Sequence, residues 1–148
     1  MHDKRLTQRL TDYWDRLRRD AQLPQIEQFN PRPLEDIMGN CCMWKVDVGG
    51  PNNNTLLYSS EFVGDGLKEI IGSAITGEVF SPHATNFPAA RILGKISHAV
   101  EDKTVIGDAG QFVHDDNRVV KYRSCLLPFG TRDGKVTNVL LGVSWRKF

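Results

Sequence analysis

The cysteines are the side chains of this sequence best suited to metal binding or nucleophilic chemistry, and their spacing argues against both. Cys41 and Cys42 are adjacent and Cys125 is distant, so zinc would lack the two-residue spacing and the fourth ligand that structural sites use. A cysteine nucleophile needs an activating histidine or a cationic neighbour, and the sequence shows no specific pairing of that kind. We therefore interpret the cysteines as small buried apolar residues.

The histidines offer one weak cofactor candidate. His98 lies opposite the apolar stripe of a predicted helix and is expected to face solvent, and His114 sits in a polar turn. His83 precedes that helix, near the expected mouth of a pocket, where a neutral imidazole could ligate a haem iron. A plain loop histidine explains this position better, so the sequence leaves any cofactor unassigned.

Acidic residues and short motifs give no sign of an enzyme. The pairs Asp115–Asp116 and Glu101–Asp102 are adjacent. Neighbouring side chains point in different directions in helices and strands, so neither pair suggests an acid–base couple. The sequence contains no phosphate-binding loop, nucleophile elbow or metalloprotease motif. We predict a protein that is not an enzyme and has no metal site.

Composition describes one ordinary globular domain. The 148 residues are 40% hydrophobic and 25% charged, which suffices for a core that folds unaided. The 19 Lys and Arg residues nearly balance 18 Asp and Glu residues, and the net charge of +1 argues against nucleic-acid binding. Three cysteines without a signal segment favour a reducing, cytoplasmic location. The apolar runs are too short to span a membrane.

The elements that must position these side chains begin with an amphipathic helix. Five apolar residues recur at helical spacing near the start of the chain, with arginines on the other faces; they are Leu6, Leu10, Tyr13, Trp14 and Leu17. Pro24, Pro31 and Pro33 then indicate an extended connector. We divide the chain into this helix with its connector, residues 1–30, and a second unit, residues 31–148.

Five strands and two central helices are predicted for the second unit. Alternation of apolar and polar residues indicates strands, and capping and proline signals indicate helices. The strands are 41–48, 55–59, 105–113, 118–127 and 136–145, and the helices are 60–71 and 88–100. This order fits an α+β fold with a single five-stranded antiparallel sheet and helices mainly on one face. The last strand is apolar on both sides and is expected to be covered on both.

The other face of the sheet needs cover, and the N-terminal helix is the available piece. One helix buries only part of that face, so we predict that two copies pack together as a homodimer. The predicted dimer interface is the apolar stripe Leu6, Leu10, Tyr13, Trp14 and Leu17. Packing of the same stripe against its own sheet is the simpler alternative.

Five short segments carry a resemblance to a known family. They are YWDRLR at 13–18, LY at 57–58, IGSAITG at 71–77, YRSCLLPF at 122–129 and DG at 133–134. In this order they resemble the PAS family of sensory domains, in particular its compact single-domain bacterial type. The segment 78–86 matches no part of the family pattern. Asn40-Cys41-Cys42 is superficially like the flavin motif of light sensors, but it lies before the position that this chemistry requires.

The resemblance implies a sensory module that binds a small molecule or associates with a signalling partner. From the resemblance and the alternation of apolar residues, we place a pocket between the sheet and the middle helices. Its predicted lining is Trp44, Tyr58, Phe87, Ile92, Ile96, Tyr122 and Val143. These residues suit plain core packing equally well. We predict a non-enzymatic PAS-like protein that dimerises and regulates a partner protein.

Two alternatives stay open. A cone-shaped α+β enzyme or small-molecule carrier would need a deep cavity with a polar couple, such as His83 with Asp108 or Arg123. A ligand-free adaptor would act by protein contact alone. Missing catalytic motifs disfavour the enzyme, and the connector and N-terminal helix favour an interaction module. The sequence does not specify the ligand, the cofactor or the partner.

Overall fold

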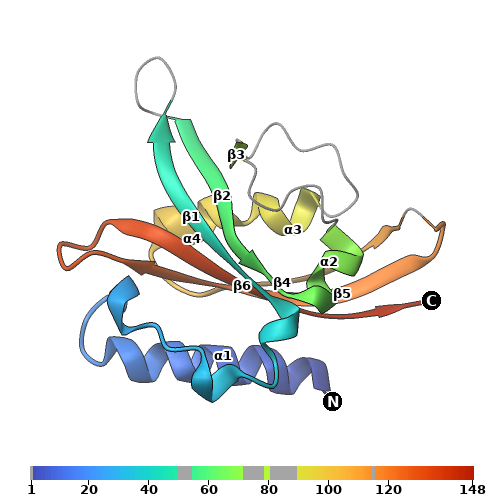
Figure 1. The fold of residues 1–148 in the computed structure, drawn as a ribbon, viewed down its shortest axis with the longest axis horizontal. Coiled ribbons are helices and arrows are strands. Elements are labelled where there is room, and N and C mark those ends of the chain that lie inside the picture. The colour runs from blue at the N-terminus through green and yellow to red at the C-terminus, as the bar shows by residue number, and fades with distance from the viewer. Residues whose placement is uncertain (1, 50–54, 72–78, 81–89, 115) are drawn as a thin grey trace.

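One antiparallel sheet organises the chain (Figure 1). The computed structural model describes residues 2–49, 55–71, 79–80, 90–114 and 116–148. The strands lie in the order β3-β2-β1-β6-β5-β4. Their bounds are β1 Cys41–Gly49, β2 Thr55–Val63, β3 Val79–Phe80, β4 Ile106–Val113, β5 Val119–Gly130 and β6 Val136–Lys147.

Helices cover both faces of this sheet. α1 (His2–Arg18) lies along one face, against β5 and β6. On the opposite face, α4 (Ile96–Asp102) contacts the same two strands and follows directly after α3 (Ala90–Gly94). α2 (Asp65–Ile71) lies beside the 3-10 turn Met38–Asn40 that leads into β1. The predicted α+β fold and the N-terminal amphipathic helix are confirmed.

α1 is fixed to the sheet by buried apolar side chains and one buried hydrogen bond. Leu10 is fully buried, and Tyr13 and Trp14 are nearly so. The indole Nε1 of Trp14 donates to the carbonyl oxygen of Pro128 on β5 at 2.7 Å. Burial of one large apolar side chain contributes about 1.5–3 kcal/mol. α1 is therefore part of the core of the molecule.

α1 packs close to β6 because the residue of β6 at the contact is a glycine. Gly142 lies between Cys41 on β1 and Cys125 on β5 in the sheet register. A Cβ atom at this position would clash with Cδ1 of Leu10 on α1. The absence of a side chain on Gly142 therefore sets the distance between α1 and the sheet.

Two polar contacts tie the connector back to α1. Arg9 forms a bidentate ion pair with Asp36, at 2.6 and 2.8 Å, and this guanidinium lowers the pKa of the Asp36 carboxyl below its ordinary value. The hydroxyl of Tyr13 donates to the carbonyl oxygen of Asn30 at 2.7 Å and accepts from the Asn30 N–H at 2.8 Å. These contacts make the connector and α1 a single packed unit.

The strands β5 and β6 are buried on both faces along about half of their length. Residues 124–130 and 138–144 are all buried, where α1 covers one face and α4 the other. Nearer its start β5 alternates, with Lys121 and Arg123 exposed and Tyr122 buried. The prediction that the last strand is covered on both sides is confirmed for its central part.

The helix predicted from residue 60 begins only at Asp65. β2 stays paired with β1 as far as Val63, which lies opposite Cys42. Gly64 then turns the chain, and a Cβ there would clash with the backbone carbonyl oxygens of the 3-10 turn before β1. The prediction was wrong at residues 60–63 because strand pairing outweighs the local helical pattern.

Two further details differ from the predicted elements. The helix predicted over 88–100 is divided at Lys95 into α3 and α4, next to Gly94, and glycine is a poor helix former. The two-residue strand β3, paired with Tyr58 and Ser59 of β2, adds a sixth strand to the five predicted.

Gly142→Ala is expected to lower the free energy of unfolding by about 1–3 kcal/mol, the usual cost of overpacking a core. The added methyl group meets the side chain of Leu10, which is fully buried in the core. Gly107→Ala is the matched control, because a Cβ there meets only the Ser124 carbonyl oxygen at 3.9 Å. Urea unfolding measures both variants, and equal losses would contradict the close docking of α1 on β6.

Candidate functional site

The sheet register brings the predicted pocket residues together on the face of the sheet that α3 and α4 cover. We call this the helix-covered face, and we call the opposite face, against which α1 packs, the α1-covered face. On β5 and β6, Tyr122 lies opposite Trp145 and Val143 opposite Ser124. β1, β2, α3 and α4 supply the others. Six of the seven are buried, none more than 4% exposed: Trp44, Tyr58, Ile92, Ile96, Tyr122 and Val143. The seventh, Phe87, lies outside the described residues.

These six side chains pack as a continuous part of the hydrophobic core. Burial raises the pKa of Tyr58 to about 12, and the negative charge of Glu101 on α4 adds to this effect. The phenol is therefore neutral near pH 7 and can only donate or accept a hydrogen bond. This arrangement fits both roles considered for the six residues, packing in the core and contact with a ligand.

A polar cluster lies on the same face, at the β4 edge of the core. The Asp108 carboxylate is 13% exposed; it accepts from the Tyr122 hydroxyl at 3.4 Å and lies 3.5 Å from Nη2 of Arg91 on α3. Burial, together with the charge of Asp108, raises the pKa of the Tyr122 hydroxyl, while Arg91 opposes the change. The cluster therefore presents a carboxylate, a neutral phenol and a half-exposed guanidinium.

Ser124 adds a buried hydroxyl to this cluster. It lies directly opposite Asp108 on β4, and its Oγ has no hydrogen-bond partner in the part of the chain that the structure describes. A buried polar atom without a partner costs free energy, and such atoms recur at functional sites. Together with the long contacts of Asp108, this hydroxyl leaves donor and acceptor capacity for a polar group of a ligand.

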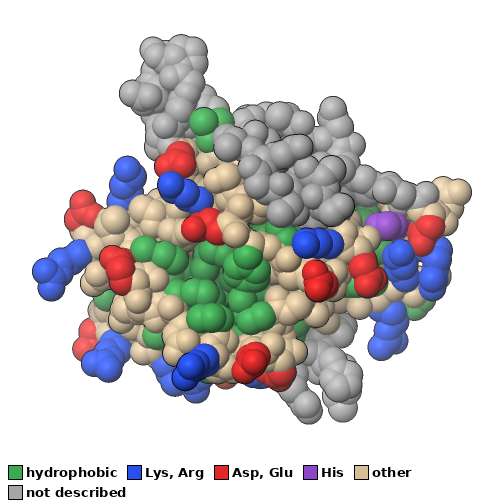
Figure 2. Space-filling model, in the orientation of Figure 1, with side chains coloured by type: hydrophobic (Ala, Val, Ile, Leu, Met, Phe, Trp, Pro, Cys, Tyr) green, Lys and Arg blue, Asp and Glu red, His purple; other side chains and the backbone are tan. Residues whose placement is uncertain are grey.

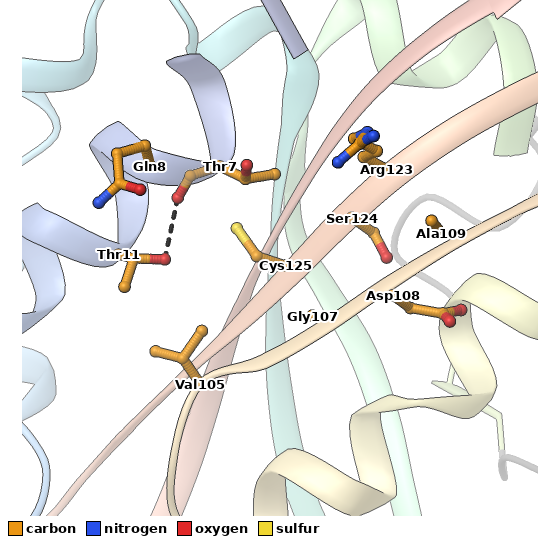
Figure 3. A pocket seen from close by; sticks show the side chains of 10 residues that line it. All are labelled: Thr7, Gln8, Thr11, Val105, Gly107, Asp108, Ala109, Arg123, Ser124 and Cys125. Carbon is orange, nitrogen blue, oxygen red and sulfur yellow. Dashed lines mark hydrogen bonds between the residues drawn. The ribbon is translucent and has the colours of Figure 1, made fainter. Parts of the chain in front are cut away.

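A groove of about 430 Å³ lies beside α1 on the α1-covered face of the sheet, and its lining residues include Asp108 and Ser124 of β4 and β5 (Figure 3). One wall is α1, which contributes Thr7, Gln8 and Thr11; Thr7 lies on the side of the helix nearest the sheet strands. The opposite wall is formed by β4 and β5, with Arg123 at one end. The groove is open and its lining mixes polar and apolar groups, unlike the enclosed sites that small organic ligands prefer.

The two alternative partners of His83 in the predicted cone-shaped enzyme lie on opposite faces of the sheet. Asp108 pairs with Ser124 and Ala109 with Arg123, and adjacent strand residues point to opposite faces. Asp108 therefore lies on the helix-covered face and Arg123 on the α1-covered face. His83 lies outside the described residues. Asp108 and Arg123 are therefore alternative partners of His83 on different faces, and neither predicted couple lies wholly within the described residues.

The three cysteines are buried free thiols. Cys41 and Cys125 lie on either side of Gly142 on the α1-covered face, and Cys42 is on the helix-covered face. Burial raises the pKa of Cys41 to about 12 and raises the pKa values of the other two thiols as well. The interpretation as small buried residues is confirmed.

The described histidines do not form a site. His98 is exposed on α4, as predicted. His114, at the end of β4, has Nδ1 3.6 Å from a carboxylate oxygen of Asp116. Asp116 also accepts from Lys147 at 2.8 Å, and this hydrogen bond is the main cause that lowers its pKa to about 2. Within the described ranges, no three His, Cys, Asp or Glu side chains gather as a metal site.

The predicted dimer stripe is mostly buried in the single chain. Leu6, Leu10, Tyr13 and Trp14 are at most 7% exposed against their own sheet, and Leu17 packs at its margin. A second copy cannot reach these side chains while α1 stays docked. Apolar side chains also gather at the centre of the face drawn in Figure 2, above α1, with charged side chains around them. The dimer stays a prediction.

Sequence reasoning missed the polar cluster as a unit. The sequence predicts Tyr122 as a pocket residue and Asp108 as a possible partner of His83, but it singles out neither Arg91 nor Ser124. The cluster depends on the pairing of β4 with β5 and on the position of α3 above them. The polar turn at 114–117 predicts the hairpin, and counting outward from it would have placed Asp108 opposite Ser124.

The fold defines a small α+β domain, one antiparallel sheet with helices on both faces. A family model described as PAS domain matches residues 2–144. The chain therefore belongs to the PAS domain family, which is typically sensory rather than catalytic. No curated protein matches the sequence significantly.

Solved bacterial structures show weaker similarity. A sensory box histidine kinase/response regulator from Burkholderia thailandensis is 12% identical, with a TM-score of 0.43 over 78% of this chain and 84% of that chain. A PAS domain from Colwellia psychrerythraea is 12% identical, at 0.44 over 79% and 94%. The PAS domain of Bordetella pertussis BvgS is 13% identical, at 0.41 over 80% and 90%.

In the described part of the chain, no helix has the length and apolar character needed to cross a membrane.

The buried thiols are expected to resist alkylation in the folded protein. Their raised pKa values keep them protonated at pH 8, and the thiolate is the reactive form. Iodoacetamide at pH 8, followed by mass spectrometry, should leave the native protein unmodified and add three groups in urea. Fast native modification of Cys125, which borders the groove, would contradict this burial.

Proposed function

We propose that this chain is a non-enzymatic sensory module that binds a small molecule and regulates a partner protein. The ligand lies on the helix-covered face of the sheet, beneath α3 and α4. The apolar residues predicted for the pocket enclose its apolar part, and the polar cluster of Asp108, Tyr122, Arg91 and Ser124 binds its polar end. Family membership supports the sensory role.

The polar cluster is the observation that carries the ligand-binding part of this proposal. A carboxylate that is 13% exposed is costly unless it is well paired, and Asp108 has only long contacts, at 3.4 and 3.5 Å. Ser124 Oγ lies across from it on the next strand without a partner among the described residues. A ligand that donates to Asp108 and Ser124 would satisfy both groups. Polar or cationic small molecules fit this requirement.

A ligand-free adaptor is the second candidate. The six described pocket residues form one continuous core, and a filled core needs no ligand. In that case the polar cluster would serve only to anchor α3 to β4 through Arg91 and Asp108.

We propose a second copy of the chain as a further partner, through α1. Since the apolar stripe is buried, the dimer would exchange α1 together with its connector, so that each helix docks on the partner's sheet. Exchange of an identical element keeps every contact of the monomer and is a low-cost route to a dimer. The bonds of Tyr13 with Asn30 would move with the helix, and the ion pair of Arg9 with Asp36 would form between the two copies.

Native mass spectrometry of freshly purified protein is expected to show mass beyond that of the denatured chain. Tyr122→Phe removes one hydroxyl from the polar cluster at nearly constant volume and should lower the retained ligand fraction by about tenfold, the usual cost of an unpaired buried group. No extra mass in the wild type would favour the adaptor.

Tyr13→Phe is the matched control for this experiment. It also removes a hydroxyl from a buried tyrosine, but on the α1-covered face, where the group bonds Asn30. It should cost about 1 kcal/mol of stability and leave the ligand fraction unchanged. Equal ligand loss in both variants would indicate a general loss of packing and would contradict the placement of the ligand.

Trp14→Ala tests the exchange of α1. The substitution removes a buried indole and its hydrogen bond to Pro128, at a cost of about 3–5 kcal/mol. Because the monomer and the exchanged dimer share this contact, sedimentation velocity at low micromolar concentration should show a dimer for the wild type and for the variant, and the loss should appear only in the free energy of unfolding. A wild type that sediments as a monomer would contradict the exchange.

A further inference from the structure

The α1-covered face is open where β5 and β6 continue past the helix. At Gly142 the sheet lies under Leu10 of α1, and the neighbouring Cys125 is buried. Two residues away along β5, Arg123 is exposed. It lies between Ala109 on β4 and Ser144 on β6. The helix therefore covers only part of this face.

Two more cations occupy the next row of the open face. Lys121 on β5 lies directly opposite Arg146 on β6, and both are exposed. Like charges placed directly opposite each other in a sheet are destabilising. With Arg123 one row away on the same face, three positive side chains are concentrated here. Lys and Arg side chains gather at the end of the molecule formed by the β4–β5 hairpin and the end of β6 (Figure 2).

No nearby carboxylate offsets these charges in the described part of the chain. Asp108 on β4 points to the opposite face, toward Arg91 of α3. Asp116, in the β4–β5 turn, is already paired with Lys147 and accepts from the Arg118 N–H. None of the ion pairs between described residues includes Lys121, Arg123 or Arg146. The fold thus tolerates a local repulsion that it does not compensate, which is typical of functional surfaces.

Apolar side chains border the three cations. Val113 and Phe148, 56% and 58% exposed, are the exposed large hydrophobic residues of the described chain. Both lie in the row beyond Lys121, where Val113 pairs with Val119 and the Phe148 N–H donates to the Val119 carbonyl oxygen at 2.8 Å. Nζ of Lys121 lies 4.7 Å from the centre of the Phe148 ring.

On the other side, the open face continues into the groove beside α1. Arg123 belongs to both, and the groove floor next to it is built by Gly107 and Ala109 of β4. These small residues leave room for a chain to lie over the strand. Thr7 and Gln8 of α1 form the polar wall.

We propose that this basic face, Lys121, Arg123 and Arg146 with the adjoining groove, binds an acidic segment of a partner protein. The inference rests on the proposed function, in which the module regulates such a partner. Carboxylates of the segment pair with the three cations, and an apolar residue beside them packs on Val113 and Phe148. Complementary charge of this kind provides specificity and fast association.

The number of cations favours a protein segment over other anions. Basic clusters that bind membranes use roughly four to eight Lys and Arg residues, and nucleic-acid binding depends on many phosphate contacts. This face has three cations, and the whole chain has a net charge of +1. Arginine together with exposed aromatic surface is typical of protein interfaces.

The test uses a short fluorescein-labelled peptide of alternating glutamate and valine, with fluorescence anisotropy as the readout. Binding should weaken by about two- to fivefold for each cation removed in Arg123→Gln and Arg146→Gln, and further as NaCl is raised. Arg132→Gln, an exposed cation in the β5–β6 turn, is the matched control and should bind like the wild type. The same peptide with lysine in place of glutamate should not bind.

Three results would overturn the proposal: no binding of the glutamate peptide, equal binding by the Arg146→Gln and wild-type proteins, or tighter binding of RNA or of phosphatidylserine vesicles than of the peptide. Tyr122→Phe acts on the opposite face and should bind the peptide normally. Loss of peptide binding would therefore count against the basic face alone, and loss of retained ligand would count against the ligand site alone.

A second measurement tests the uncompensated repulsion itself. Arg146→Glu places an acid opposite Lys121, so it should raise the urea midpoint while it weakens binding of the glutamate peptide. Arg132→Glu should leave both unchanged. A lower midpoint for Arg146→Glu would show that the two cations are not in conflict, and it would remove the argument for an external partner.

Discussion

The fold depends on covering both faces of β5 and β6. The two longest strands of the sheet are buried on both faces over 124–130 and 138–144, so the sheet exposes a large apolar surface unless a helix lies on each side. α4 supplies one cover. α1 supplies the other through Leu10 against Gly142 and through the hydrogen bond of Trp14 to Pro128. Because α1 lies far from β5 and β6 in the sequence, this docking joins the two ends of the chain.

This constraint gives the two faces different properties. On the helix-covered face the core is closed and apolar, and its polar groups are concentrated around Asp108, Tyr122 and Ser124. On the α1-covered face the helix is too narrow to cover β4 and the far ends of β5 and β6, and it leaves a groove and exposed cations. The proposed small-molecule site and the proposed site for a protein segment therefore lie on opposite faces, with β5 contributing to both.

The sequence predicts most of this fold because the spacing of apolar residues along each element reflects which of its sides is buried. The 3.6-residue stripe of α1 and the alternation in the long strands are both visible in the chain, and the family resemblance spans the same elements. The residues after Ser59 were misassigned because a short mixed run has no clear period, and only pairing with β1 keeps it extended. The sequence also does not show which residues of neighbouring strands lie side by side in the sheet. Asp108 and Ser124, or Lys121 and Arg146, become neighbours only when the strands pair.

The central claim is that the helix-covered face holds the ligand while α1 stays outside the binding site. Amide hydrogen exchange, compared between protein as purified and protein unfolded, dialysed and refolded, tests it most directly. The account predicts faster exchange in α3, α4 and the part of β5 around Tyr122 after ligand removal, with α1 unchanged. Identical exchange in both preparations, or a change confined to α1 and the groove, would contradict it.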